Sequence, residues 1–220
     1  MRSKTLTVLF SIILVISCQS QNTETPYKVG NSYLYKVTVK DSNSEVIIID
    51  TLKFTIKKKG VIGGIFGMNM AEWTSAKSPD NKQERGINID KNSVEIQPPA
   101  GFDYLENENI VIAGYPSFSA EMLVGSTSES DHFFPKSYGK LAGKELKQHK
   151  VVRDSAEVKF KEEMINCKVT AYKNLSLIDE FGQYHLKAFY NNEYGFIRMD
   201  YTYPNEKELR FQLVDIESES

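Results

Sequence analysis

Three histidines offer the most versatile chemistry in the chain, because imidazole acts both as a general base and as a metal ligand. They are His132, His149 and His185. We expect His132 to lie in a loop and the other two to lie in strands among lysines and polar residues. A structural zinc site needs four close ligands at recognisable spacing, which the sequence does not provide. We interpret all three as surface residues and predict no metal site.

Nucleophilic residues also lack the sequence context of catalysis. The segment Gly125-Ser126-Thr127-Ser128-Glu129 lacks the second glycine of a Gly-x-Ser-x-Gly turn, so we interpret it as a polar loop. Cys167 falls on the apolar side of an alternating segment with no histidine nearby, which predicts a buried small hydrophobic residue. Acidic residues are abundant, but no pair stands out as a glycosidase site. We expect a non-catalytic protein without a cofactor.

Aromatic residues are the remaining candidates for a binding site. Seven of the eight candidates fall between residues 97 and 138, where proline and glycine interrupt any long strand. An apolar pocket at the mouth of a β-barrel is a common ligand site. Alternatively, such residues close the end of the barrel and fill its core. The candidate ligand-binding residues are Trp73, Phe102, Tyr104, Tyr115, Phe118, Phe133, Phe134 and Tyr138.

The elements that would position these residues are strands, because apolar and polar residues alternate along most of the chain. The last third predicts a three-stranded meander with strands over residues 184–190, 196–203 and 209–216. In the first strand, we expect Tyr33, Tyr35, Val37 and Val39 to share one face. Further strands are expected at 45–57, 66–73, 86–96, 144–153, 156–160 and 165–172.

The interrupted stretch is harder to interpret. Short strands are expected at 110–112 and 122–124, and a small helix would also fit within residues 101–123. About ten strands with short turns and no crossover helices predict an all-β fold. We therefore expect an antiparallel meander that forms a half-barrel or a closed barrel.

Size and charge limit the possible partners. The 220 residues carry a formal net charge of −2, without a basic stripe that would neutralise phosphates. Nucleic acid is therefore excluded as an expected partner. The length suits one domain with a sizeable core.

The N-terminus has the composition of a secretory signal. A short basic start is followed by an almost unbroken apolar run from Leu6 to Ile16. A transmembrane helix and a buried core helix are the alternatives. The apolar run is shorter than the roughly 20 residues that span a bilayer, and the polar residues 19–26 follow it.

Val15-Ile16-Ser17-Cys18 resembles the lipobox of bacterial lipoproteins. The resemblance implies that Cys18 becomes the first mature residue and carries acyl chains, which anchor stably when there are two or more. By the same resemblance, Gln19 in place of aspartate favours the outer membrane, and the leaflet stays open. We thus expect a signal at 1–17, a lipidated cysteine and polar tether at 18–26, and one β domain at 27–220. Cys167 then has no partner for an intramolecular disulfide.

The two ends of the domain resemble a class of uncharacterised Bacteroidetes lipoproteins. The resemblance rests on the opening residues 27–33 (YKVGNSY) and the closing residues 193–201 (EYGFIRMDY). It implies a curved sheet similar to the lipoprotein-carrier half-barrel, and it implies no reaction. Asp50-Thr51-Leu52 and Asp154-Ser155-Ala156 also resemble the O-glycosylation triplet of that group, which implies glycans on Thr51 and Ser155.

Three functions remain open, in order of preference. The first is a membrane-anchored module that binds a lipid or another apolar molecule in the barrel mouth. The second is a structural adapter that works through a protein partner in the cell envelope. The third is an envelope hydrolase.

Overall fold

The computed structural model describes residues 25–57, 69–99, 102, 107–134, 136 and 139–218. Cys18, Tyr104 and Tyr138 lie outside these ranges. The expected signal and most of the expected tether lie outside them too. The architecture below therefore concerns the β domain.

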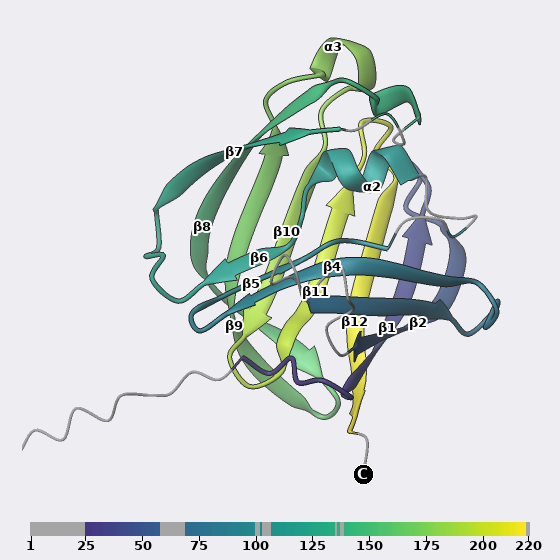
Figure 1. Ribbon diagram of the computed structural model, residues 1–220, viewed down its shortest axis with the longest axis vertical. Coiled ribbons are helices and arrows are strands. Elements are labelled where there is room, and N and C mark those ends of the chain that lie inside the picture. The colour runs from purple at the N-terminus through teal and green to yellow at the C-terminus, as the bar shows by residue number, and fades with distance from the viewer. Residues whose placement is uncertain are drawn as a thin grey trace, which may run out of the picture.

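Twelve antiparallel strands form one curved sheet (Figure 1). They are β1 (Ser32–Lys40), β2 (Val46–Lys57), β3 (Asn69–Ser75), β4 (Lys82–Asp90), β5 (Ser93–Ile96), β6 (Ser117–Ser119), β7 (Thr127–Phe133), β8 (Glu145–Phe160), β9 (Glu163–Asn174), β10 (His185–Asn191), β11 (Gly195–Thr202) and β12 (Glu208–Glu217). The helical elements are α2 (Asn107–Ala113), the 3-10 turn η1 (Gly139–Leu141) and α3 (Ile178–Phe181).

The strand order places the first and last described strands side by side at the centre of the sheet. The order is β6-β5-β4-β3-β2-β1-β12-β11-β10-β9-β8-β7, so β1 pairs with β12. The edges, β6 and β7, come from the middle of the sequence and do not pair with each other. The predicted all-β antiparallel fold is confirmed, as a sheet that curls without closing.

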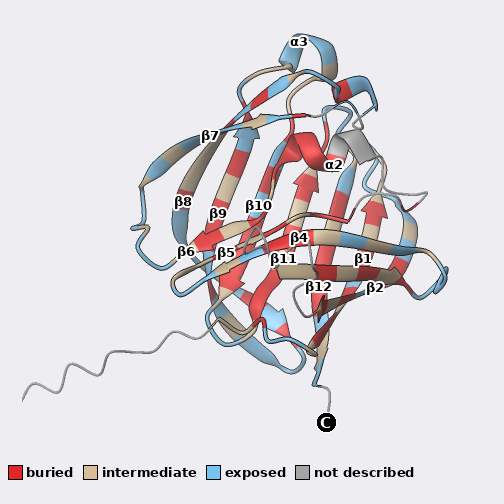
Figure 2. Ribbon diagram, viewed as in Figure 1, coloured by how far each residue is buried: buried red, intermediate tan, exposed pale blue. Residues whose placement is uncertain are grey.

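The core lies inside the curl, where side chains of alternate residues meet. Figure 2 shows buried and more exposed positions alternating along the central strands. The expected shared face of β1 is confirmed, since Tyr33, Tyr35, Val37 and Val39 are all buried. Rings from both halves of the sheet touch, with 6.1 Å between the centroids of Trp73 and Phe211. Large aromatic side chains thus supply much of the buried apolar area.

Helix α2 packs against β9 and β11, and its residues Ile110–Ala113 are buried (Figure 1). The strand expected at 110–112 is therefore wrong, and the small helix expected within 101–123 is confirmed. A short apolar run that is buried suits either element, so its pattern cannot decide between them. The strand expected at 122–124 is also wrong, because Leu123 and Val124 lie in an exposed turn. No helix in the described ranges has the length and apolar character needed to cross a membrane.

Strand β7 corrects a second expectation. The residues expected to form a polar loop around Ser126, and the loop expected at His132, belong to or adjoin this strand. None of its residues is buried, because β7 is an edge strand whose two faces are both at least partly open to solvent. A strand without a buried face has no apolar alternation to reveal it.

Candidate functional site

The eight aromatic residues expected to line one mouth do not come together. Trp73, Phe102 and Phe134 are buried in the core, whereas the Phe133 side chain is 71% exposed at the end of β7. Tyr115 is half-buried, contacts His132 and packs against the edge of the core. Of the described members, Phe118 lines one hollow and Tyr115 lines another.

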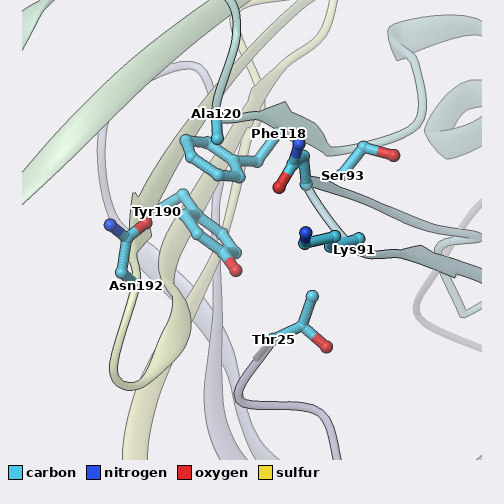
Figure 3. Close-up of a pocket in the computed structure, with 8 residues that line it drawn as sticks. Thr25, Lys91, Ser93, Phe118, Ala120, Tyr190 and Asn192 are labelled. Carbon is cyan, nitrogen blue, oxygen red and sulfur yellow. The ribbon is translucent and has the colours of Figure 1, made fainter. Parts of the chain in front are cut away.

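The hollow at Phe118 is built on a stacked pair of rings. The ring of Phe118 lies 3.9 Å from that of Tyr190, at an interplanar angle of 10° (Figure 3). The ammonium group of Lys168 lies 5.4 Å from the centroid of Phe118, within the range of a cation–π contact. We call the hollow over this pair the mouth pocket; its lining residues are Thr25, Lys91, Asn92, Ser93, Phe118, Ala120, Tyr190 and Asn192.

Strand pairing places both rings. Phe118 is the central residue of β6, between Ser117 and Ser119, and pairs with Val94 of β5. Alternation turns the apolar side chains of this pair toward the core and the flanking serines away from it. Tyr190 is the penultimate residue of β10, just after the register shift against β11 that follows Phe189. The pocket therefore lies where the edge strand β6 meets the opposite wall.

The mouth pocket has an apolar floor and a polar rim. Burial raises the pKa of Tyr190, so its phenol stays protonated at neutral pH and can donate a hydrogen bond. Lys91 and Asn192 stand at the rim in Figure 3, with the Tyr190 hydroxyl turned toward Thr25. The pocket encloses about 20 Å³. Since a water molecule needs roughly 10–15 Å³, it admits only a very small group in this conformation.

A second hollow lies on the other face of β6, between β5–β6 and the inner face of β7–β8. We call it the seam crevice; it encloses about 60 Å³ and is lined by Glu95, Tyr115, Ser117, Ser128, Ser130, His132, Gln148, Lys150 and Tyr172. The rings of Tyr115 and His132 are 5.1 Å apart in it. Sequence reasoning singled out neither Glu95 nor Lys150. Their shared location depends on contacts between residues 55 positions apart, which no local pattern reveals.

A third hollow of about 230 Å³ lies on the outer face of β10–β12. Asp200 accepts hydrogen bonds from Arg198 and Arg210 there. His185 also lines this hollow and is exposed, as expected. His149 is half-buried, 3.9 Å from the carboxylate of Glu129. Within the described ranges, no three histidine, cysteine or acidic side chains group as a metal site would require.

Cys167 is fully buried, which confirms the expectation of a small core residue. Burial raises the pKa of its thiol to about 11, so almost no nucleophilic thiolate is present at neutral pH. The two residues expected to carry glycans lie on strands, with Thr51 half-buried in β2 and Ser155 exposed in β8. Glycosylation of either stays a prediction.

No protein-family model matches the chain, and no curated protein matches it by sequence. A Bacteroides fragilis protein with a YmcC-like fold is similar in structure, with a TM-score of 0.47 and 8% identity, over 88% of this chain and 98% of that one. The hypothetical lipoprotein YmcC from Escherichia coli is also similar in structure, with a TM-score of 0.42 and 7% identity, over 87% of this chain and 89% of that one. A beta-barrel-like protein from Brucella abortus has a TM-score of 0.41 and 8% identity, over 87% of this chain and 98% of that one. These similarities concern the overall fold alone, and they assign neither a family nor a ligand.

Proposed function

We propose that this chain is a lipoprotein of the cell envelope that is anchored through Cys18 and binds a lipid acyl chain at the mouth pocket. The observation that carries the proposal is the place of Thr25. This residue lies near the end of the expected tether at 18–26 and lines the same pocket as Phe118 and Tyr190. The pocket would therefore be held close to the membrane that supplies the ligand.

Chain geometry limits how far the pocket stands from the anchor. Thr25 lies seven positions after Cys18, and an extended chain spans at most about 3.3–3.6 Å per residue. The pocket would thus lie within about 25 Å of the anchored cysteine. A lipid need not leave the vicinity of the bilayer completely to reach such a site.

The chemistry of the mouth pocket suits an amphipathic molecule. The stacked rings of Phe118 and Tyr190 offer an apolar floor, whereas Lys91 and Asn192 offer polar groups at the rim. Because the mouth pocket is small, it admits only the terminal methyl group of an acyl chain in this conformation. Deeper insertion of the acyl chain requires Phe118 to move. Phe118 lies on β6, which is three residues long and is held to β5 by only three paired positions, so β6 is the strand most easily displaced here.

Native mass spectrometry of residues 19–220, followed by organic extraction, tests the proposal directly. A stoichiometric lipid or fatty acid on the purified domain would support it. A ligand-free domain that also fails to bind added lysophosphatidylethanolamine would count against it.

The chain offers a matched pair of variants for this experiment. Phe118→Leu keeps the core filled but removes the stacked ring, and we expect at least a fivefold loss of bound lipid. Phe133→Leu changes the same residue type at an exposed position outside the pocket and should leave binding unchanged. Equal retention by both variants would exclude Phe118 from the site.

An adapter function is the second candidate, favoured by two adjacent apolar residues in the loop between β6 and β7. The side chains of Leu123 and Val124 are 76% and 61% exposed. Apolar groups at the tip of a loop are typical of contact with another protein. A photo-crosslinking residue at Leu123 should then capture one envelope protein in intact cells, and the same residue at exposed Ala142 should not.

A further inference from the structure

The seam crevice exists because β6 packs against the inner face of the opposite wall and not against the other edge strand. Three groups of Ser117 form hydrogen bonds with residues of the opposite wall, Tyr172 of β9 and Lys150 of β8. Its N–H donates to the Tyr172 hydroxyl at 2.8 Å, and its carbonyl oxygen accepts from the same hydroxyl at 2.8 Å. The side-chain oxygen of Ser117 accepts from the ammonium group of Lys150 at 3.1 Å.

Two opposite charges face the crevice without pairing. Glu95 and Lys150 both line it, and among the described residues neither forms an ion pair. Desolvation raises the pKa of the Glu95 carboxyl, although His132 and Lys150 oppose the shift. Desolvation likewise lowers the pKa of Lys150, and Glu95 opposes that shift. For each group, the loss of hydration therefore outweighs the stabilising effect of the opposite charge.

Partly buried charges are costly unless a partner satisfies them. The remaining lining supplies hydrogen-bonding groups, namely the hydroxyls of Ser128 and Ser130 and the imidazole of His132. At roughly 10–15 Å³ for each water-sized group, a volume of about 60 Å³ accommodates about four to six non-hydrogen atoms. The crevice is therefore polar, small and furnished with both signs of charge.

We propose that the seam crevice binds a small zwitterion, whose ammonium group pairs with Glu95 and whose anionic oxygen pairs with Lys150. A small free α-amino acid such as alanine matches this charge pattern and the volume of the crevice. The phosphoethanolamine head group of a lipid shares the charge pattern but is larger, so part of it would remain outside the crevice. The site is separate from the mouth pocket, because Ser117 and Phe118 point to opposite faces of β6. It therefore does not depend on acyl-chain binding.

Equilibrium dialysis of the full mature protein in detergent micelles tests the inference with four labelled probes. L-alanine and glycerophosphoethanolamine carry both charges, whereas ethanolamine and glycerol 3-phosphate carry one sign each. We expect at least one zwitterion to bind at least tenfold more tightly than either singly charged probe. Preference for alanine would identify an amino acid, and preference for glycerophosphoethanolamine would identify a head group. Absence of zwitterion binding, or equal binding of a singly charged probe, would overturn the proposal.

Variants that each remove one charge test whether the zwitterion binds in the seam crevice. Glu95→Gln and Lys150→Met should each weaken zwitterion binding at least tenfold, because each leaves one ligand charge unpaired. Glu84→Gln and Lys82→Met change exposed residues of β4 and should leave the affinity unchanged. Thermal unfolding of every variant verifies that the fold is retained. Unaltered affinity in folded Glu95→Gln would reject the crevice as the site.

Discussion

The hydroxyl of Tyr27 lies directly against Gly195, leaving no space for a side chain. A β-carbon at position 195 would stand 2.5 Å from the Tyr27 oxygen, and the backbone there has φ +82°. The same hydroxyl accepts a hydrogen bond from the N–H of Phe196 at 2.8 Å. The segment that follows the expected tether is thus fixed to the β10–β11 hairpin.

Gly195→Ala should lower the free energy of unfolding by about 2–4 kcal/mol. It combines left-handed backbone strain with displacement of Tyr27 from a buried position. Gly143→Ala is the matched control, since Gly143 has φ +75° and nothing lies within 4 Å of its β-carbon position. That variant should cost only about 1 kcal/mol. Urea denaturation measures both, and equal losses would show that the contact with Tyr27 is unimportant.

Asn174→Ala should cost about 2–4 kcal/mol, because several polar groups around it lose their partners. The Asn174 amide nitrogen donates to the carbonyls of Ser176 and Gly182, each at 3.0 Å. Its oxygen accepts from the N–H of Tyr184 at 2.7 Å. The exposed Asn166 is the control, and its replacement by alanine should change stability by less than about 0.5 kcal/mol.

Stability should fall steeply above pH 10. Burial raises the pKa of six core phenols, so they keep their protons in the folded state when the unfolded chain releases them near pH 10. The unfolded state then binds fewer protons, and each phenol costs up to about 1.4 kcal/mol per pH unit until its folded pKa is reached. These residues are Tyr27, Tyr33, Tyr35, Tyr172, Tyr190 and Tyr201.

Phenolate absorbance during an alkaline titration measures this effect. We expect these tyrosines to ionise together with loss of the near-ultraviolet circular dichroism signal. Gradual ionisation near pH 10 with the fold intact would contradict the prediction.

Cys167 should resist alkylation in the folded protein. A rise of its pKa from 9.0 to about 11 lowers the thiolate population at pH 8 about a hundredfold, and burial blocks access as well. Iodoacetamide should therefore react at least about a hundredfold more slowly with the native protein than with the urea-unfolded chain. Rapid native labelling, read by peptide mass spectrometry, would show that β9 opens frequently.

Tyr172→Phe should loosen the edge strand β6. The loss of the hydroxyl leaves the N–H of Ser117 without its partner, at a cost of about 1–3 kcal/mol. Hydrogen exchange of the Ser117 and Ser119 amides should accelerate more than exchange in β1. Tyr190→Phe is the control, because the structure records no hydrogen bond from that hydroxyl to a described residue. Identical exchange in both variants would mean that backbone pairing with β5 alone holds β6.

The fold class was accessible from the sequence wherever a strand has one buried face. The alternation through Tyr33–Val39 and the turns at 191–195 and 204–207 each indicated the observed element. Where both faces share the same environment, the signal disappears. Strand β7 is partly open to solvent on both faces, and the described part of α2 is buried, so neither has a periodic pattern.

The candidate sites were less accessible, because they depend on which strands meet. Phe118 was identified for its residue type, but its partner Tyr190 lies in a strand that pattern analysis assigned to a separate meander. Glu95 and Lys150 were indistinguishable from other charged residues until the sheet brought them to one crevice. Conversely, Phe133 and Phe134 are neighbours in sequence, and alternation sends one to solvent and the other to the core.

The central pairing of β1 with β12 has a consequence for the order of folding. Ser32 pairs with Glu217, so the two halves of the sheet cannot join until residues around position 217 are free to pair with β1. Until then β1 presents an unpaired, apolar edge, the kind of surface that promotes aggregation. Contacts of such long sequence separation also slow folding. The folding chain would therefore pass through a stage of two incomplete half-sheets, in which a chaperone would be most effective.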